Sequence, residues 1–130
     1  MERLPLLYDQ DCGVCRTLLG AVLAWDRAAR LRPVPLQSTE ANALLDGMPL
    51  ELRMASWHLQ GPHGLRSAGA AFEDLFAVLP GAAPLAALTR RAPGPSERAY
   101  RLVAGNRSSL SRLVPRALRD RADALIARRA

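Results

Sequence analysis

The sequence predicts an α/β fold with a helical C-terminal extension. Over roughly residues 3–80, short apolar runs alternate with stretches of helical periodicity. The only two cysteines, Cys12 and Cys15, lie where the first apolar run gives way to the first helical stretch. A Cys-x-x-Cys pair at a strand-to-helix junction is typical of thioredoxin-like proteins. We therefore expect one domain, residues 1–130, with a thioredoxin-like β-α-β-α-β-β-α core over about residues 3–80 and a helical extension over about residues 83–130.

The first strand and helix carry the cysteine pair. Residues 3–8 form an apolar run that predicts a short buried strand. Asp11 is the expected N-cap of the following helix, whose apolar face is Leu18, Leu19, Val22 and Leu23. Residues 31–36 predict a second strand, and its prolines, Pro33 and Pro35, favour an edge position.

The second half of the core predicts a short helix, a hairpin and a longer helix. Ser38 is the expected N-cap of the short helix, with Glu40 in its first turn. Residues 52–59 and 65–68 predict two strands joined by a turn-rich connection. Residues 70–79 then predict a helix with Phe72, Leu75, Phe76 and Leu79 on one face.

The C-terminal extension is predicted to be helical throughout. An apolar segment at residues 85–88 is followed by a proline-rich break, after which Ser96 is the expected cap of a helix that carries Tyr100. After Pro115, a last amphipathic helix is expected, with Leu118, Ala122, Leu125 and Ile126 on one face.

Charge is distributed unevenly, although the net charge is only +6. Residues 1–88 carry 7 arginines and 9 acidic side chains, whereas residues 89–130 carry 11 arginines and 3 acidic side chains, and there is no lysine. Such an arginine excess suits an anionic membrane or nucleic-acid surface, or it simply solvates helix faces. The tail lacks aromatic interleaving and nucleic-acid motifs, so we expect no specific nucleic acid and only weak anionic-surface contact through residues 89–130.

The expected location is the cytoplasm. No apolar run approaches the roughly 20 residues that span a bilayer, and the N-terminal residues lack the pattern of a signal peptide. In a reducing compartment, a lone cysteine pair is expected to be catalytic or metal-binding rather than a structural disulfide.

The cysteine pair has the spacing for dithiol–disulfide exchange. Unpaired N–H groups and the helix dipole favour a thiolate in the first helical turn, and Cys12, expected nearest the solvent, is the predicted attacking thiolate. Cys15, one turn deeper, would resolve the mixed disulfide. A metal site is the alternative, but only His58 and His63 offer further histidine or cysteine ligands, so we expect no metal.

Two carboxylates flank the pair and oppose thiolate formation. We expect Asp11 to cap the helix, while Asp9 either relays a proton to or from Cys15 or ends the strand through an Asx-type turn. Arg16, next to Cys15, could offset the two carboxylates.

Several segments match one family pattern in the same order. Residues 7–15 read Leu-Tyr-Asp-Gln-Asp-Cys-Gly-Val-Cys, residues 26–27 read Asp-Arg, and residues 35–38 read Pro-Leu-Gln-Ser. Residues 69–72 read Gly-Ala-Ala-Phe, and residues 100–107 contain the box Tyr-x-x-Val-Ala-x-Asn-Arg. Together they resemble the DCC thiol-disulfide oxidoreductase family over about residues 4–114. The chain departs from the family in having Gln10 in place of a glycine and no third cysteine after the Asn-Arg box.

The resemblance implies a thioredoxin-like fold and a protein or small-molecule disulfide reductase. It places Asn106 and Arg107 in a family box, where Arg107 would bind a substrate carboxylate or pin the last helix to the sheet. Fold analogy also suggests a cis proline beside the cysteines, for which Pro49, after Met48, is the candidate, although a trans turn proline is equally compatible with the sequence.

The leading hypothesis is therefore a disulfide oxidoreductase that cycles Cys12 and Cys15 between dithiol and disulfide without a bound cofactor. Its expected partners are a disulfide-containing protein or small thiol substrate and an upstream thiol reductant. The alternative is a redox-silent, arginine-rich module that binds an anionic membrane or nucleic acid.

Overall fold

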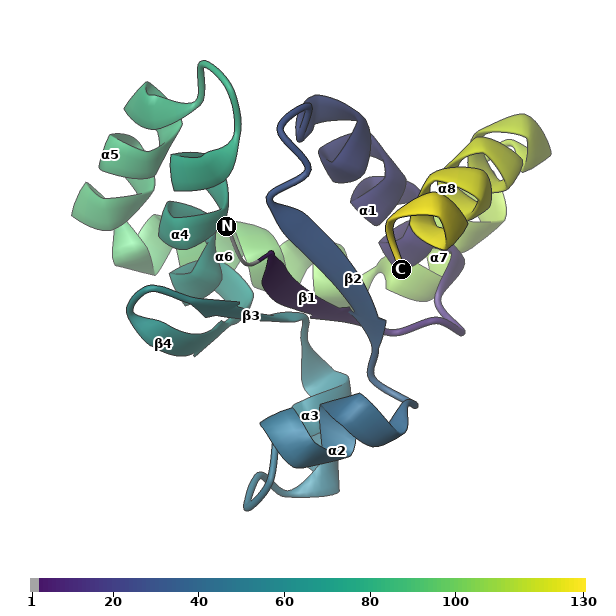
Figure 1. Ribbon diagram of the computed structural model, residues 1–130, viewed down its shortest axis with the longest axis horizontal. Coiled ribbons are helices and arrows are strands. Elements are labelled where there is room, and N and C mark those ends of the chain that lie inside the picture. The colour runs from purple at the N-terminus through teal and green to yellow at the C-terminus, as the bar shows by residue number, and fades with distance from the viewer. Residues whose placement is uncertain (1–2) are drawn as a thin grey trace.

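The computed structural model describes residues 3–130, which form a four-stranded mixed sheet with helices on both faces (Figure 1). The strands are ordered β2-β1-β3-β4 across the sheet. Strands β1 (Leu4–Tyr8) and β2 (Leu31–Pro35) are parallel, while β3 (His58–Gly61) is antiparallel both to β1 and to β4 (Gly64–Ser67). The α/β class predicted from the sequence is confirmed.

Strand β2 lies at one edge of the sheet and carries both of its prolines there. Pro33 is paired with Leu6, and Pro35 with Tyr8. A proline cannot donate to a second neighbour, so the edge is where a strand tolerates it. The predicted edge position is confirmed.

Alternation along β1 divides the core between the two faces of the sheet. Leu6 and Tyr8 pack with Leu19 and Leu23 of helix α1 (Gly13–Trp25). Leu7 belongs to the opposite cluster, which contains Val34, Leu36, Ala41 and Leu45. Helices α2 (Thr39–Leu44) and α3 (Leu50–Ala55) lie beside this second cluster. Because side chains of a strand alternate between faces, one apolar strand supplies both halves of the core.

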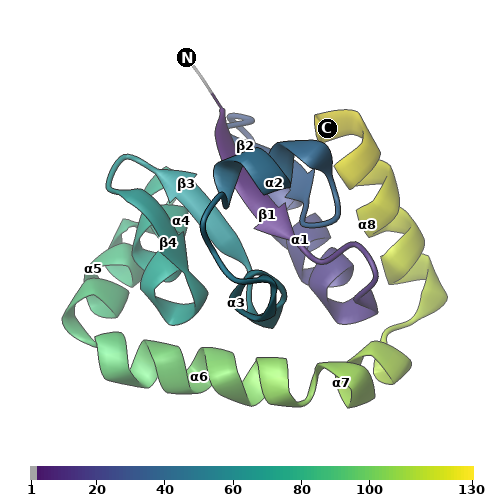
Figure 2. The ribbon, with the colours of Figure 1, turned by 90° about the horizontal axis from the view of Figure 1, so that it is seen from below.

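The remaining helices run around one edge of the molecule and return to its starting helix. A short 3-10 turn, Ala68–Ala71, leads into α4 (Phe72–Val78), and then follow α5 (Ala83–Arg91), α6 (Pro93–Gly105), α7 (Arg107–Leu113) and α8 (Arg116–Arg129). Figure 2 shows α6 and α7 crossing below the sheet, from the side of α5 to the side of α8. Helix α8 then packs along α1.

The contact between α1 and α8 is close and partly ionic. A Cβ added at Gly20 would come within 2.4 Å of the Cβ of Ala122, so the two backbones approach without room for a larger side chain. At the end of α8, Arg129 donates through Nη1 to the fully buried Asp26 at 3.1 Å and through Nη2 to the carbonyl of Leu23. The helix that begins at the cysteines is therefore held in place by the C-terminal end of the chain.

Two element predictions are wrong in their detail. Residues 52–59, predicted as one strand, begin inside α3, and the strand starts only at His58. Ser96, predicted as a helix cap, lies inside α6, which already begins at Pro93, and its hydroxyl donates to the carbonyl of Ala92. Proline has the backbone angle of a first helical turn, which explains the earlier start.

None of the helices within residues 3–130 is both long enough and apolar enough to cross a membrane.

Candidate active site

The two cysteines lie at the N-terminus of α1 and are joined by a disulfide, with their Cα atoms 5.2 Å apart. Cys12 is the N-cap of the helix: its backbone is extended, and its Sγ accepts from the backbone N–H of Cys15 at 3.3 Å. The prediction that Asp11 caps the helix is therefore wrong by one residue. The sulfur occupies the position that a capping oxygen usually takes.

The order of exposure differs from the expected one. Cys12 is only 9 % exposed, whereas Cys15 is half-buried. Cys12 nevertheless lines a cavity of about 300 Å³, together with Asp9, Asp11, Gly13, Arg107, Ser108 and Ser111. We call this hollow the cysteine cavity. It gives an incoming group a route to Cys12 from the side of α7.

The cysteine cavity brings together residues from two distant parts of the sequence. One wall is the loop between β1 and α1, with Asp9 and Asp11, and the other is the start of α7, with Arg107. Of the predicted site residues, these three and Cys12 share the cavity. Cys15 joins them through the disulfide, and Asn106 and Pro49 do not line it.

Asp9 organises the loop that precedes the disulfide. Its Oδ1 accepts from the backbone N–H of Asp11 at 2.9 Å, which is an Asx turn, and from Nε2 of Gln37 at 2.8 Å. The other end of the Gln37 amide accepts from the backbone N–H of Gln10 at 3.3 Å. Gln10 does not adopt a positive φ, so this loop does not need a glycine there.

Ser111 of α7 is a site residue that the sequence did not reveal. Its Oγ accepts from the backbone N–H of Val14 at 3.0 Å, across 97 residues of sequence. This bond satisfies one of the free N–H groups in the first turn of α1. The contact depends on the path of α6 and α7, and the only hint in the sequence is that several serines follow the Asn-Arg box.

The Asn-Arg box lies at the joint between α6 and α7. Asn106 donates through Nδ2 to the carbonyl of Leu102 at 2.7 Å, so its side chain closes the end of α6. Arg107 is half-buried in the cysteine cavity, and its guanidinium makes no hydrogen bond or ion pair with any residue that the structure describes. Within residues 3–130, no hydrogen bond or ion pair of Arg107 ties the last helix to the sheet, and binding of a substrate carboxylate by Arg107 stays a prediction.

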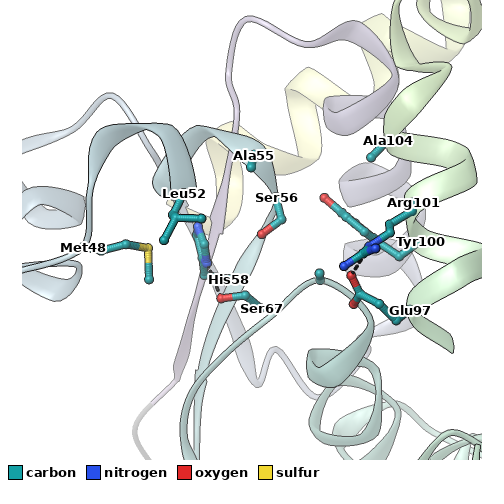
Figure 3. Close-up of a pocket in the computed structure, with 11 residues that line it drawn as sticks. Met48, Leu52, Ala55, Ser56, His58, Ser67, Glu97, Tyr100, Arg101 and Ala104 are labelled. Carbon is teal, nitrogen blue, oxygen red and sulfur yellow. Dashed lines mark hydrogen bonds and ion pairs between the residues drawn. The ribbon is translucent and has the colours of Figure 1, made fainter. Parts of the chain in front are cut away.

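Pro49 is placed elsewhere and is trans, so the suggestion of a cis proline beside the cysteines is wrong. Helix α3 separates Pro49 from β3, and Trp57 is the residue directly before that strand. Met48 lines a second, larger cavity of about 480 Å³ between α3, the β3–β4 hairpin and α6 (Figure 3). No lining residue is common to the two cavities.

The buried His58 and the half-buried Tyr100 line this second cavity. The Nε2 of His58 bonds to the carbonyl of Arg53 at 2.9 Å, and its Nδ1 bonds to Oγ of Ser67 (Figure 3). Burial lowers the pKa of His58 below 6.5, and the bond to Arg53 opposes this shift. The hydroxyl of Tyr100 accepts from the backbone N–H of Trp57 at 3.2 Å, and burial raises the pKa of this phenol.

His63 lies in a separate charged cluster at the hairpin. Its Nδ1 bonds to Oδ1 of the buried Asp74 at 2.8 Å, and Glu73 completes a group of three whose ligand atoms lie within 4.8 Å of one another. Nη1 of Arg66 lies 3.5 Å from Oε2 of Glu73 and 3.8 Å from Oδ1 of Asp74, so its positive charge balances these carboxylates. Neither His63 nor His58 lines the cysteine cavity, so the histidines do not add ligands to the cysteine pair.

The disulfide thus terminates a helix, opens on a polar cavity and is flanked by charges of both signs, an arrangement suited to thiol–disulfide exchange. The family model for DCC1-like thiol-disulfide oxidoreductases matches residues 6–113, which include both cysteines and the Asn-Arg box. A search of curated proteins found no significant match, and neither did a search of solved structures. The match covers most of the sequence, and the chain belongs to the DCC1-like thiol-disulfide oxidoreductase family.

Proposed function

We propose that the protein reduces disulfide bonds, in proteins or small molecules, with the Cys12–Cys15 dithiol. The observation that carries this proposal is the position of the pair, a disulfide at the N-terminus of α1 beside an open polar cavity. Free N–H groups and the helix dipole at this position stabilise a thiolate, which is the form that attacks a disulfide.

In the proposed cycle, Cys12 is the attacking residue. Its thiolate attacks one sulfur of the substrate disulfide, forms a mixed disulfide and releases the other sulfur as a thiolate that takes up a proton. The Cys15 thiolate then attacks Sγ of Cys12, which releases the second substrate thiol and closes the Cys12–Cys15 disulfide. An upstream thiol reductant returns two electrons to the pair, and no bound cofactor is needed. Cys12, and not Cys15, lines the cavity, which supports this division of roles.

Asp9 is the proposed proton relay for Cys15. It lines the cysteine cavity and is half-buried, which supports this role, while its Asx turn and its bond to Gln37 support a purely structural one. In Asp9→Asn, loss of a relay would shift the pH–rate profile of disulfide reduction. An unchanged profile, at equal folding stability, would remove Asp9 from the mechanism.

The direct test is a disulfide-reduction assay on the wild type, Cys12→Ser and Cys15→Ser, with the reduction potential of the wild-type pair measured in parallel. We expect Cys12→Ser to be inactive and Cys15→Ser to accumulate a mixed disulfide with substrate, visible by mass spectrometry. Full activity in Cys12→Ser would overturn the proposal. A potential more oxidising than that of the substrate disulfides would make the pair accept electrons from substrate thiols and would reverse the proposed direction.

The proposed working compartment is the cytoplasm, where thiol systems supply the electrons that a reductase needs. The redox-silent alternative, an arginine-rich module for an anionic surface, predicts binding that falls steeply with added salt and does not change in Cys12→Ser.

A further inference from the structure

The cysteine cavity holds two side chains of opposite charge whose charged groups are left largely unpaired. Arg107 makes no ion pair or hydrogen bond through its guanidinium within residues 3–130. Asp11 is exposed, and among residues 3–130 its carboxylate accepts a single long hydrogen bond, 3.4 Å from Nε2 of Gln37. The guanidinium of Arg107 is therefore available to a ligand in the cavity.

The third charged group of the cavity is already in use. Asp9 accepts two hydrogen bonds of 2.9 and 2.8 Å, from the backbone of Asp11 and from Gln37. The remaining binding capacity is therefore one cation, Arg107, and one anion, Asp11, on a cavity that Cys12 also lines. The hydroxyls of Ser108 and Ser111 make the same wall polar.

We propose that this cavity selects small disulfides of the α-amino-acid type, which carry a carboxylate and an ammonium group close to the sulfur. The inference rests on the proposed reductase function and names its substrate class. Arg107 would bind the carboxylate through its planar guanidinium, and Asp11 would bind the ammonium group. Both are specificity-determining residues, while Cys12 performs the exchange.

The dimensions and the charge of the cavity favour this class. A hollow of about 300 Å³ has room for a compact polar group beside the sulfur. A substrate with a carboxylate alone would face Asp9 and Asp11, and one with an ammonium group alone would face Arg107, so a group with both charges fits best. Arginine forms paired, charge-assisted hydrogen bonds with a carboxylate, which gives orientation as well as affinity.

The reaction is balanced by the dithiol itself. One substrate disulfide accepts two electrons and two protons and becomes two amino-acid thiols, while the Cys12 and Cys15 thiols become the enzyme disulfide. A dithiol reductant such as dithiothreitol then restores the pair in the assay.

Four small disulfides separate the charge contributions. Cystine carries both charges, 3,3′-dithiodipropionate only carboxylates, cystamine only ammonium groups, and bis(2-hydroxyethyl) disulfide neither. We expect kcat/KM for cystine to exceed that for the neutral disulfide by about tenfold or more, after correction for the uncatalysed exchange of each compound, since each added charge pair is worth a few-fold to tenfold.

Variants then assign each charge to a residue. Arg107→Gln should lower kcat/KM for cystine and dithiodipropionate by about tenfold relative to the neutral disulfide, and Asp11→Asn should do so, more weakly, for cystine and cystamine. Arg112→Gln and Asp120→Asn make the same charge changes at exposed positions that do not line the cavity, and they serve as matched controls.

The outcomes separate the two proposals. If all four compounds are reduced with equal kcat/KM, or if Arg107→Gln and Arg112→Gln change the four rates in the same proportion, the substrate inference is wrong while the reductase function stands. The same holds if only protein disulfides are reduced. If no disulfide is reduced faster by the wild type than by Cys12→Ser, the proposed function itself fails.

Discussion

Around the disulfide, individual polar groups are satisfied by side chains from far along the chain. The first turn of α1 offers N–H groups, of which Cys12 Sγ takes that of Cys15 and Ser111 Oγ takes that of Val14. The bond from Cys15 acts on Cys12 Sγ directly and favours negative charge on that sulfur, while the bond from Val14 to Ser111 satisfies a second N–H group of the helix start.

Replacing Ser111 should weaken the fold at the active site. In Ser111→Ala the Val14 N–H loses its acceptor, so we expect the free energy of unfolding to fall by about 1 kcal/mol, the usual value of a cap bond. Urea unfolding of the oxidised protein measures it. Ser109→Ala is the control, because Ser109 is exposed on the same helix and makes no side-chain hydrogen bond among the described residues. Equal loss in both variants would contradict the capping role.

His58 should make stability depend on pH. Burial lowers the pKa of His58 below 6.5 in the folded protein. As the pH falls toward and below 6.5, the unfolded chain therefore binds a proton at this histidine more readily than the folded protein does. The free energy of unfolding should therefore decrease from pH 7.5 to pH 5.5, by up to about 1.4 kcal/mol per pH unit for this one group. We expect His58→Gln to show a shallower slope over this range in urea unfolding. An identical slope would mean that other groups cause the dependence.

At the scale of elements, the sequence correctly predicted features that depend on neighbouring residues alone. The prediction failed at α3, where a strand-like alternation coincides with helix-forming residues. The edge prolines of β2 and the cap at Ser38 are local, and both are confirmed, the cap by a bond from the Ala41 N–H to Ser38 Oγ. Helix α3 was missed because residues 50–55 alternate apolar and polar side chains, as a strand does. None of residues 50–55 is buried, so a strand here would gain no packing of an apolar face against the core. Leu, Glu, Arg, Met and Ala all have high helix propensity, and the segment adopts a helix instead.

The close contact between α1 and α8 yields an element-scale prediction. In a free helix, Gly20→Ala would be favourable by about 1 kcal/mol. Here the new Cβ would meet Ala122 at 2.4 Å, which forces the helices apart. We expect a net loss of stability of about 1–3 kcal/mol in thermal or urea unfolding. Gly105→Ala in α6 is the matched control, since no atom lies within 4 Å of its added Cβ, and it should not destabilise. A Gly20→Ala protein as stable as this control would show that α8 does not pack closely on α1.

For the whole molecule, the decisive feature is the return of the C-terminal segment to the first helix. The sequence located the cysteines, the acidic residues of the loop and the Asn-Arg box, but not that Arg107 and Ser111 line one cavity with Cys12. Those contacts depend on how α6 and α7 run along the edge of the sheet, which no local periodicity specifies (Figure 2). Likewise, the helix after Pro115 was predicted, and Ala122 and Ile126 lie on its buried face as expected, but Leu118 of the same predicted face is exposed. The packing of this helix on α1 was not predicted.

The packing of α8 against α1 should depend most on Arg129. Its guanidinium bonds to Oδ2 and the carbonyl of Asp26 and to the carbonyl of Leu23, and Asp26 is fully buried. Arg129→Leu keeps much of the side-chain volume but leaves the Asp26 carboxylate with only the N–H groups of Arg30 and Leu31, so we expect a loss of about 3 kcal/mol. Arg128→Leu removes a neighbouring charge from an exposed position and should cost much less.

Loss of this anchor, the bonds that Arg129 makes to Asp26 and Leu23, should also change the accessibility of the active-site cysteine. If α8 holds α1 and α7 together, Arg129→Leu should also increase the rate at which an alkylating reagent modifies the reduced Cys12, because α7 packs on α1 and Ser111 bonds to Val14, two residues from Cys12. Urea unfolding measures the stability, and timed alkylation followed by mass spectrometry measures the exposure of the thiol. Loss of stability without faster alkylation would show that the anchor stabilises the fold but does not control access to the cysteine cavity. Equal stability of Arg129→Leu and Arg128→Leu would contradict the anchor itself.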